Sequence, residues 1–358
     1  MNLQLKRLKE LSEVAGVSGN EHRIKNLLKD RLLPVSEEIF YDKLGSVIFK
    51  SKNNSDELKI MLAAHMDEVG FMVKTITAEG FLRFTCLGGW WEQVMLGQRV
   101  IVHAKTKDIT GVIGCKAPHI LTPEERKKIV EKKDMYIDIG VESQKEAEAL
   151  GIYPGTFITP SVQFEVMADE NYLLGKAWDD RIGCAIMADV VEALSEKEHP
   201  NTIYATATVQ EEVGLRGALT SANKISPDVA IIIDTCVAGG VPGVTKEQAS
   251  AEIGKGVAIT IYDASMIPNT KLRDLVLDIA KAEKIDHQIS FSEGGGTDAG
   301  RIHMQDIGVP SIVLSIPTRY IHSHQGVIHK HDYETAIQLI LAVIGKLDNI
   351  CYNTIVQY

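Results

Sequence analysis

Apolar strand-like runs alternate with amphipathic helical segments over the second half of this chain, from about Tyr172 onward. The strand-like runs are Thr202 to Val209, Val229 to Ile233, Ala258 to Ile261 and Ser311 to Ile316. Another buried-strand pattern, Lys59 to Ala64, occurs earlier. Runs of this kind are typical of strands that are covered on both faces, and their alternation with helices predicts an α/β sheet covered by helices.

The stretch from about Phe71 to Val162 has a different pattern, with short alternating runs separated by glycines, as in a small β domain. One helix is predicted inside it, from about Pro123, because Thr122 can cap the helix and Glu125 follows three residues later. Apolar residues at helical spacing predict further helices at Leu3 to Val14, Glu21 to Leu33 and about Asp332 to Ile350.

Composition excludes several classes of protein. A chain of 358 residues is long enough for two domains, and its formal charge of −10 disfavours binding to nucleic acid. The longest apolar runs are far shorter than the roughly 20 residues that cross a bilayer, and the N-terminus lacks a secretion signal. Five widely spaced cysteines without a Cys-x-x-Cys pair favour a reducing compartment. We therefore expect a cytoplasmic protein without a membrane partner.

Residues that can bind metal ions follow four of the strand-like runs. They are His65, the pair Glu211 and Glu212, Asp234, and His322. In open α/β sheets ligands gather beyond the carboxyl ends of the strands, so these side chains are expected to meet in one crevice. Asp179 and Asp180, in a loop that leads into a helix, can reach the same edge, and the pattern alone does not choose between them.

Each of these signals also has a purely structural interpretation. His65 could be a histidine at a strand end, and the Glu-Glu pair could be a solvated helix start. Asp179 or Asp180 could cap a helix, and Asp234 could be a turn residue. Asp67, two residues after His65, favours the functional interpretation, because a carboxylate often holds the unligated nitrogen of a metal-binding histidine.

Four histidines lie within ten residues, and only the first is retained as a ligand, with His324 as its rival. The run from Ser292 to Gly300 (SEGGGTDAG) lacks the lysine of a phosphate-binding loop and is expected to let the backbone approach substrate. A His-Glu-x-x-His helix and a Gly-x-Ser-x-Gly elbow are both absent from the sequence.

Six ordered motifs resemble those of one family. They are AHMDEVG (Ala64 to Gly70), AWDDRIG (Ala177 to Gly183), QEEVGLRGA (Gln210 to Ala218), IIIDT (Ile231 to Thr235), GGTDAG (Gly295 to Gly300) and RYIHS (Arg319 to Ser323). They resemble the tetrahedral (TET) aminopeptidases, also known as deblocking or glutamyl aminopeptidases and sometimes as endoglucanases. The likeness covers nearly the whole chain.

The resemblance implies a role for each candidate residue. Asp179 would bridge two divalent metals, His65 and Asp234 would complete one site, and Glu212 and His322 the other. Glu211 would be the general base, with Asp67 orienting His65, and the Asp179-Asp180 peptide would be cis. Zinc is the expected metal, with cobalt or manganese as alternatives, because the ligands are nitrogen and oxygen without thiolate. The chain departs from the family after His322. Members of the family often have Pro two residues and Glu four residues after this histidine, whereas this chain has His324 and Gly326.

The resemblance also implies the fold and the activity. Residues 1–70 and 163–358 would form a discontinuous catalytic domain around a mixed sheet, and residues 71–162 an inserted barrel, PDZ-like, that forms dimers within a tetrahedral homododecamer. The expected reaction is removal of the N-terminal residue of short peptides by a hydroxide held between two metals. The alternatives are a deacylase of acylated amino acids with the same site, an endoglucanase, which needs free carboxylates, and a noncatalytic assembly protein.

Overall fold

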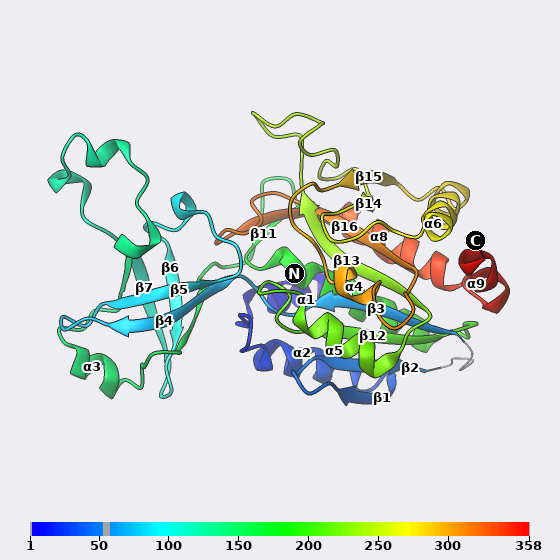
Figure 1. The fold of residues 1–358 in the computed structure, drawn as a ribbon, viewed down its shortest axis with the longest axis horizontal. Helices are drawn as coiled ribbons and strands as arrows, with labels where there is room; N and C mark the ends of the chain where they lie inside the picture. The colour runs from blue at the N-terminus through cyan, green and yellow to red at the C-terminus, as the bar shows by residue number, and fades with distance from the viewer. Residues whose placement is uncertain (1, 53–57, 358) are drawn as a thin grey trace.

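The main sheet of this computed structural model has eight strands, in the spatial order β1-β2-β12-β3-β13-β16-β14-β15 (Figure 1). The structure describes residues 2–52 and 58–357. The strands are β1 (Ser36–Tyr41), β2 (Val47–Ser51), β12 (Thr202–Thr208), β3 (Lys59–His65), β13 (Val229–Val237), β16 (Ser311–Thr318), β14 (Val257–Tyr262) and β15 (His287–Phe291). The four from β12 to β16 run parallel, whereas β2 and β14 pair antiparallel with this group. The expected mixed sheet is confirmed.

Helices cover both faces of this sheet. On one side lie α1 (Leu3–Glu13), α2 (His22–Leu32), α4 (Trp178–Ser195), α6 (Thr270–Ala282) and α8 (Lys330–Ile344), with α9 (Asn349–Val356) against α6. On the other side lie α5 (Arg216–Ile225) and α7 (Ala299–Ile302). Burial on both faces explains why the middle of β3 and the first half of β13 are continuously apolar.

Alternation along the central strands decides which face receives the polar residues at their ends. In β3, Ile60 and Leu62 pack into the core under α4, whereas Met61 and Ala63 pack into the core under α5 and α7. Successive side chains of a strand point to opposite faces, so His65 shares the face of Met61 and Ala63.

A closed barrel of six strands forms the second part of the molecule, with strand order β4-β5-β8-β7-β6-β9 (Figure 1). Its strands are β4 (Gly70–Ile76), β5 (Leu82–Leu87), β6 (Arg99–His103), β7 (Asp108–Gly114), β8 (Tyr136–Asp138) and β9 (Phe157–Pro160). Phe71, Val100 and Ile137 belong to its own core. A small sheet of β10 (Glu165–Val166), β11 (Tyr172–Gly175) and β17 (Gly326–His329) lies outside both.

The helix predicted from Pro123 is wrong. Only a 3-10 turn forms there, η3 (Glu125–Lys127). Similar turns in this part of the chain are η1 (Glu92–Val94), η2 (Pro118–Ile120) and η4 (Lys132–Asp134). The capping interaction exists, because the Thr122 amide donates to Glu125 and the Glu125 amide donates to the Thr122 hydroxyl. The next apolar residue, Ile129, is 55% exposed, so a helix here would bury no apolar face. The short helix α3 (Gln144–Ala149) forms instead.

The last predicted helix is divided into two. Helix α8 ends at Ile344, and α9 begins after Asp348, whose side chain accepts a hydrogen bond from the Cys351 amide at 2.7 Å. Over residues 2–52 and 58–357, no single helix is long and apolar enough to cross a membrane; α8 and α9 pass that test only as a pair, and they are bent by 95°. Cytoplasmic location stays a prediction.

A buried arginine fixes the chain that follows β3. The Arg181 guanidinium, from the first regular turn of α4, donates to the carbonyl oxygens of Met66, Leu11, Val14 and Gly16. Buried main-chain carbonyls that lack a partner are costly, so this one side chain ties α1, the loop after it and the segment after His65 to α4. The segment that follows His65 and carries Asp67 is therefore tied to α4.

Candidate metal centre

His65 and Asp234 lie on neighbouring parallel strands. The last paired residues of β3 and β13 are Ala63 and Ile232, so the same register carried two residues further sets His65 opposite Asp234. Both side chains point to the face of α5 and α7, because they alternate with residues of the other core. Two strands that run apolar to this point thus deliver an imidazole and a carboxylate side by side.

The two aspartates before α4 have different surroundings. The Asp180 carboxylate is fully buried and accepts hydrogen bonds from the His65 amide at 3.1 Å and the Gly183 amide at 3.0 Å, so it caps the regular part of the helix. The Asp179 carboxylate instead lies 3.0 Å from His65 Nε2 and 3.5 Å from His322 Nε2. The cap and the candidate ligand are therefore different residues, and the peptide bond between them is cis, as the resemblance implies.

Buried carboxylates hold the loop of Glu211 and Glu212 by its amides. The Asp67 carboxylate accepts from the amides of Glu211 at 2.9 Å and Glu212 at 3.2 Å, and from the Ser18 hydroxyl at 2.6 Å. Glu21 accepts a hydrogen bond from the Gln210 amide at 3.1 Å, and burial raises the pKa of Glu21 to about 7. The two glutamates are therefore not a solvated helix start, since α5 begins only at Arg216.

Asp67 contacts His65 in a different way from the one expected. The ring nitrogen Nδ1 lies 2.9 Å from the main-chain carbonyl oxygen of Asp67, and 3.7 Å from its carboxylate. The carbonyl accepts the Nδ1 proton and leaves Nε2 to face Asp179, which fixes the orientation of the ring. The carboxylate is then available to hold the glutamate loop.

The barrel supplies the support of His322. Nδ1 of His322 lies 2.9 Å from the carbonyl oxygen of Gly89, in the loop after β5, and Nε2 lies 3.7 Å from Glu212 Oε2. The family residues missing after His322 are thus not the only means of orienting this ring. His324, the rival ligand, is 2% exposed and packs against Phe71 and Trp90.

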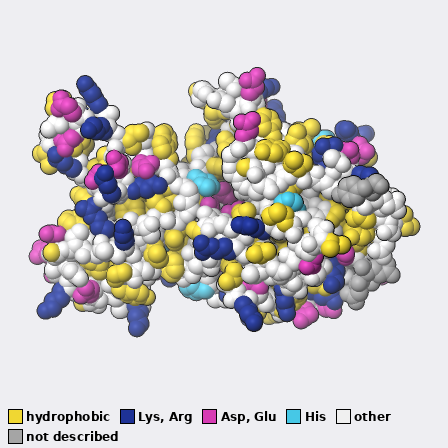
Figure 2. Space-filling model, in the orientation of Figure 1, with side chains coloured by type: hydrophobic (Ala, Val, Ile, Leu, Met, Phe, Trp, Pro, Cys, Tyr) yellow, Lys and Arg dark blue, Asp and Glu magenta, His cyan; other side chains and the backbone are white. Residues whose placement is uncertain are grey.

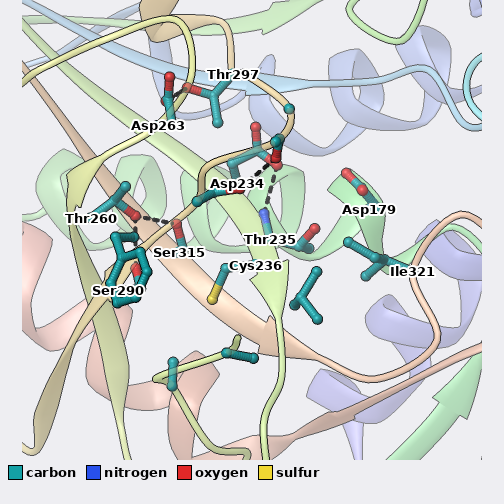
Figure 3. A pocket seen from close by; sticks show the side chains of 18 of the residues that line it. Asp179, Asp234, Thr235, Cys236, Thr260, Asp263, Ser290, Thr297, Ser315 and Ile321 are labelled. Carbon is teal, nitrogen blue, oxygen red and sulfur yellow. Dashed lines mark hydrogen bonds between the residues drawn. The ribbon is translucent and has the colours of Figure 1, made fainter. Parts of the chain in front are cut away.

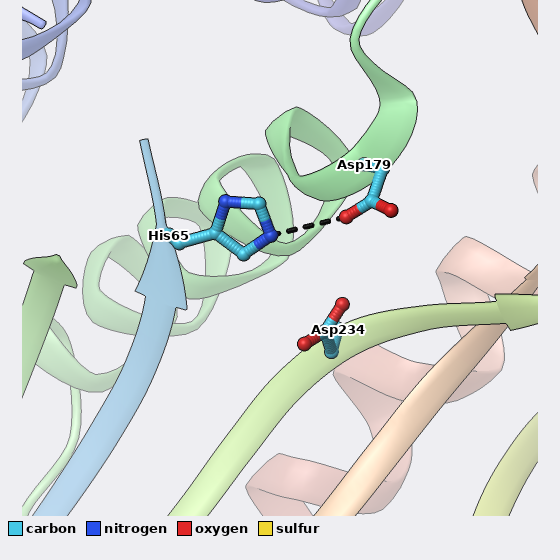
Figure 4. A group of neighbouring side chains, drawn as sticks. All are labelled: His65, Asp179 and Asp234. Carbon is cyan, nitrogen blue, oxygen red and sulfur yellow. Dashed lines mark hydrogen bonds and ion pairs between the residues drawn. The ribbon is translucent and has the colours of Figure 1, made fainter. Parts of the chain in front are cut away.

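Among the described residues, two groups could each hold a metal ion, and they share one residue. One group is His65, Asp179 and Asp234 (Figure 4), and the other is Asp179, Glu212 and His322. Within each group the candidate ligand atoms lie within 4.8 Å of one another. His324 and Asp180 belong to neither group. The five predicted ligands therefore meet, with Asp179 in the middle.

The charges at this centre are poorly compensated by the protein itself. Burial raises the pKa of Asp234 and of Glu211 well above the usual range of a carboxyl group, and that of Glu212 to about 8. Burial lowers the pKa of His322, but the hydrogen bond with Asp179 and the charge of Glu212 outweigh it and raise that pKa to about 10. Ionised carboxylates in this place need positive charge nearby.

Divalent cations fit these residues. The donors are imidazole nitrogens and carboxylate oxygens, a set that binds zinc and similar ions. Oε1 of Glu212 is buried and has no hydrogen-bond partner among the described residues, as expected of an atom that binds something else. Glu211 belongs to neither group, but its Oε2 lies 4.0 Å from His65 Nε2. A carboxylate that is close to the ligands and is not one of them can act as a base.

One further acidic residue was not assigned a role by the sequence. Asp298, at the start of α7, is 2% exposed; one of its oxygens accepts from the Thr208 hydroxyl, and the other has no hydrogen-bond partner within residues 2–52 and 58–357. Burial raises its pKa to about 6, and its charge helps to raise the pKa of Glu211 and Asp234. The GGTDAG motif contains this residue, and the motif was the only signal for it.

A cavity of about 770 Å³ opens from the centre. Figure 2 shows it as a hollow with acidic side chains inside and a histidine at its edge. It is lined by the centre itself, by the chain from Asp234 to Val237, and by the glycine-rich loop from Ser292 to Thr297. That the backbone of this loop approaches substrate stays a prediction.

Gly88 allows the barrel to approach the centre. Its φ is +81°, and a Cβ added there would lie 2.7 Å from Val69 Cγ1 and 3.0 Å from Glu212 Oε2. We expect Gly88→Ala to displace Glu212 and to weaken binding of one metal by about 10- to 100-fold, the range seen when the support of a ligand is removed. Metal content after dialysis against buffered metal measures this.

Gly97→Ala is the matched control, since Gly97 also has positive φ, +76°, but apart from its chain neighbours no atom of the described residues lies within 4 Å of an added Cβ. In both variants, backbone strain should lower the free energy of unfolding by about 1 to 2 kcal/mol. Equal metal content in the two variants would contradict the assignment of Glu212 as a ligand.

Comparisons with known proteins agree on one family of aminopeptidases. The family model described as M42 glutamyl aminopeptidase matches residues 45–339. A glutamyl aminopeptidase of Lactococcus lactis subsp. cremoris (strain MG1363) is 35% identical over 96% of this chain and 96% of its own length.

Solved structures agree with this match. The TET aminopeptidase from the marine sediment archaeon Thaumarchaeota archaeon SCGC AB-539-E09 is 46% identical, with a TM-score of 0.96 over 98% of both chains. The TET1 peptidase of Pyrococcus horikoshii, which can assemble into a tetrahedron or a large octahedral shell, is 32% identical, with a TM-score of 0.87 over 96% of this chain and 100% of its own.

Proposed function

Since the chain belongs to the M42 glutamyl aminopeptidase family, we propose that this metal-dependent aminopeptidase removes the N-terminal residue of short peptides with two divalent cations and one glutamate base. The proposed metal ligands are His65, Asp179, Glu212, Asp234 and His322. The observation that carries the proposal is the pair of ligand groups joined through Asp179. A carboxylate common to two groups is the arrangement expected of a site for two neighbouring ions.

The chain's own residues divide the work. Bound cations would polarise the scissile carbonyl and lower the pKa of the attacking water. Glu211 takes a proton from that water and returns it to the leaving amine, a role supported by its burial and by its position outside both ligand groups. Asp67 holds the Glu211 amide at 2.9 Å, which keeps the base in place.

Zinc is the proposed metal, with cobalt or manganese as substitutes. Three carboxylates and two neutral imidazoles leave one positive charge when two divalent ions are bound. Substrate or solvent oxygen can balance that charge. The donor set is nitrogen and oxygen, without thiolate, so it suits all three ions.

We also propose that residues 71–162 form a dimerisation domain within a twelve-subunit shell, around a catalytic domain of residues 1–70 and 163–358. Support comes from the related TET1 peptidase, whose subunits assemble into a tetrahedron. The barrel also exposes apolar side chains, among them Trp91, Ile120 and Tyr153, each at least 55% exposed. The mass in solution, measured by light scattering, tests this assembly.

Metal removal is the test of the proposed reaction. We expect p-nitroanilides of free amino acids to be hydrolysed, the activity to be lost on chelation, and Zn²⁺, Co²⁺ or Mn²⁺ to restore it with about two ions per subunit. Preferential hydrolysis of N-acetyl amino acids would point to a deacylase instead. Cleavage of a soluble glucan that survives chelation would point to an endoglucanase, which needs no metals.

A further inference from the structure

The cavity beside the metal centre continues well beyond the ligands. Asp179 and Ile321 lie at one end, and Thr260, Ser290 and Ser315 lie at the other, with Cys236 between them (Figure 3). In the reaction proposed above, a substrate whose first peptide bond lies at the ligands has this remaining space for its first side chain. The residues of that space therefore decide which N-terminal residue is accepted.

The far wall is built from small hydroxyl side chains on three neighbouring strands. Thr260 Oγ1 of β14 lies 3.0 Å from Ser290 Oγ of β15 and 2.8 Å from Ser315 Oγ of β16. All three residues are buried. The short side chains leave room for a long substrate side chain, and hydroxyl oxygens can accept hydrogen bonds from an amine at its tip.

The lining carries an excess of negative charge. Seven of its residues are Asp or Glu, and, among the described residues that line the cavity, none is Lys or Arg. Four of the seven belong to the metal centre, and the other three are Glu247, Asp263 and Glu293. Two divalent cations would balance four of these charges, so the cavity stays acidic with its metals bound.

The three additional carboxylates surround the cavity in two ways. Asp263 is buried, and its carboxylate accepts hydrogen bonds from the Ser265 amide at 2.7 Å and from the Thr297 hydroxyl at 3.0 Å, which fix its position in the wall. Glu247 and Glu293 are exposed and also line the cavity. A glutamyl side chain would enter this space without a cation to pair with, whereas a lysyl side chain would lower the net charge.

We propose that this cavity selects a first residue with a basic side chain of the lysine type, accepts uncharged side chains, and disfavours glutamyl and aspartyl residues. The proposal rests on the aminopeptidase reaction proposed above. It separates this chain from the acidic preference in the name of its family. It is supported by the acidic residues that line the cavity and by the absence of Lys and Arg from the described residues of that lining.

The test is a set of kcat/KM values at low salt, where electrostatic differences are largest, for the metal-loaded enzyme with Lys, Leu and Glu p-nitroanilides. We expect the Lys substrate to exceed the Glu substrate by at least about tenfold, with Leu between them. Hydrolysis of the Glu substrate at the same rate or faster would overturn the proposed selectivity and leave the aminopeptidase reaction intact. Failure to hydrolyse any of the three would overturn both.

Reversing the charge of one lining residue provides a second, independent test of the proposed selectivity. Glu293→Lys should lower the ratio of Lys to Glu activity by about threefold or more, because it removes one negative charge and adds a positive one. Glu198→Lys makes the same change in net charge on an exposed residue outside the cavity and should leave the ratio unchanged. An equal effect of the two variants, or none from Glu293→Lys, would contradict the proposal.

Discussion

Glu211→Gln is expected to lower kcat by about 10² to 10⁴-fold while the enzyme keeps about two metal ions per subunit. The amide has nearly the shape of the carboxylate, so the loop and its hydrogen bond to Asp67 should persist. It cannot take a proton from water, however, and the proposed general base is lost. Metal analysis and kcat on one aminoacyl substrate measure the two quantities separately.

The neighbouring glutamate provides the control. Glu212→Gln makes the same chemical change one residue away, but Glu212 belongs to a ligand group and Glu211 does not. Glu212→Gln should therefore lose metal, and activity with it, whereas Glu211→Gln should lose activity alone. Full activity of Glu211→Gln, or loss of metal from both variants, would show that the roles are wrongly assigned.

The second large effect is expected for Asp179→Asn. The Asp179 carboxylate is common to both ligand groups, so its loss should weaken both metals at once. Removal of a residue that only supports a ligand costs about 10- to 100-fold in metal affinity, and loss of a shared ligand should cost at least that. Titration of the chelated protein with Zn²⁺, followed by calorimetry, would measure it.

Asp180→Asn is the matched comparison. Asp180 caps α4 through the Gly183 amide and also accepts a hydrogen bond from the His65 amide of β3, so its replacement should lower the unfolding temperature by an amount equivalent to about 0.5 to 2 kcal/mol. Two metals should still bind. If Asp180→Asn instead lost both metals and Asp179→Asn kept them, the bridging role would belong to the other aspartate.

The residues on strands were the part of the site that the sequence could predict. His65 and Asp234 follow buried apolar runs, and parallel strands bring such ends together whatever the details of the loops. Asp179 was harder to distinguish from Asp180. The two differ only through local backbone conformation, since Ala177 has φ +55° and the helix is not regular before Arg181.

The features that were missed depend on contacts between distant segments. The support of His322 comes from a main-chain carbonyl of Gly89, and a carbonyl leaves no signature in the choice of residue. The predicted helix from Pro123 had the right cap but lacked an apolar face to bury. A cap alone stabilises a helix by about 1 kcal/mol, which is less than its nucleation costs without tertiary packing.

The contact between Gly89 and His322 has a consequence for chimeric enzymes. A barrel exchanged between relatives at its two connections to the sheet would bring its own chain from Gly88 to Trp90, and with it the carbonyl that orients a proposed ligand. Chimeras that keep these residues in register should retain a competent centre. Chimeras in which these residues are shifted by even one position should fold but lack aminopeptidase activity.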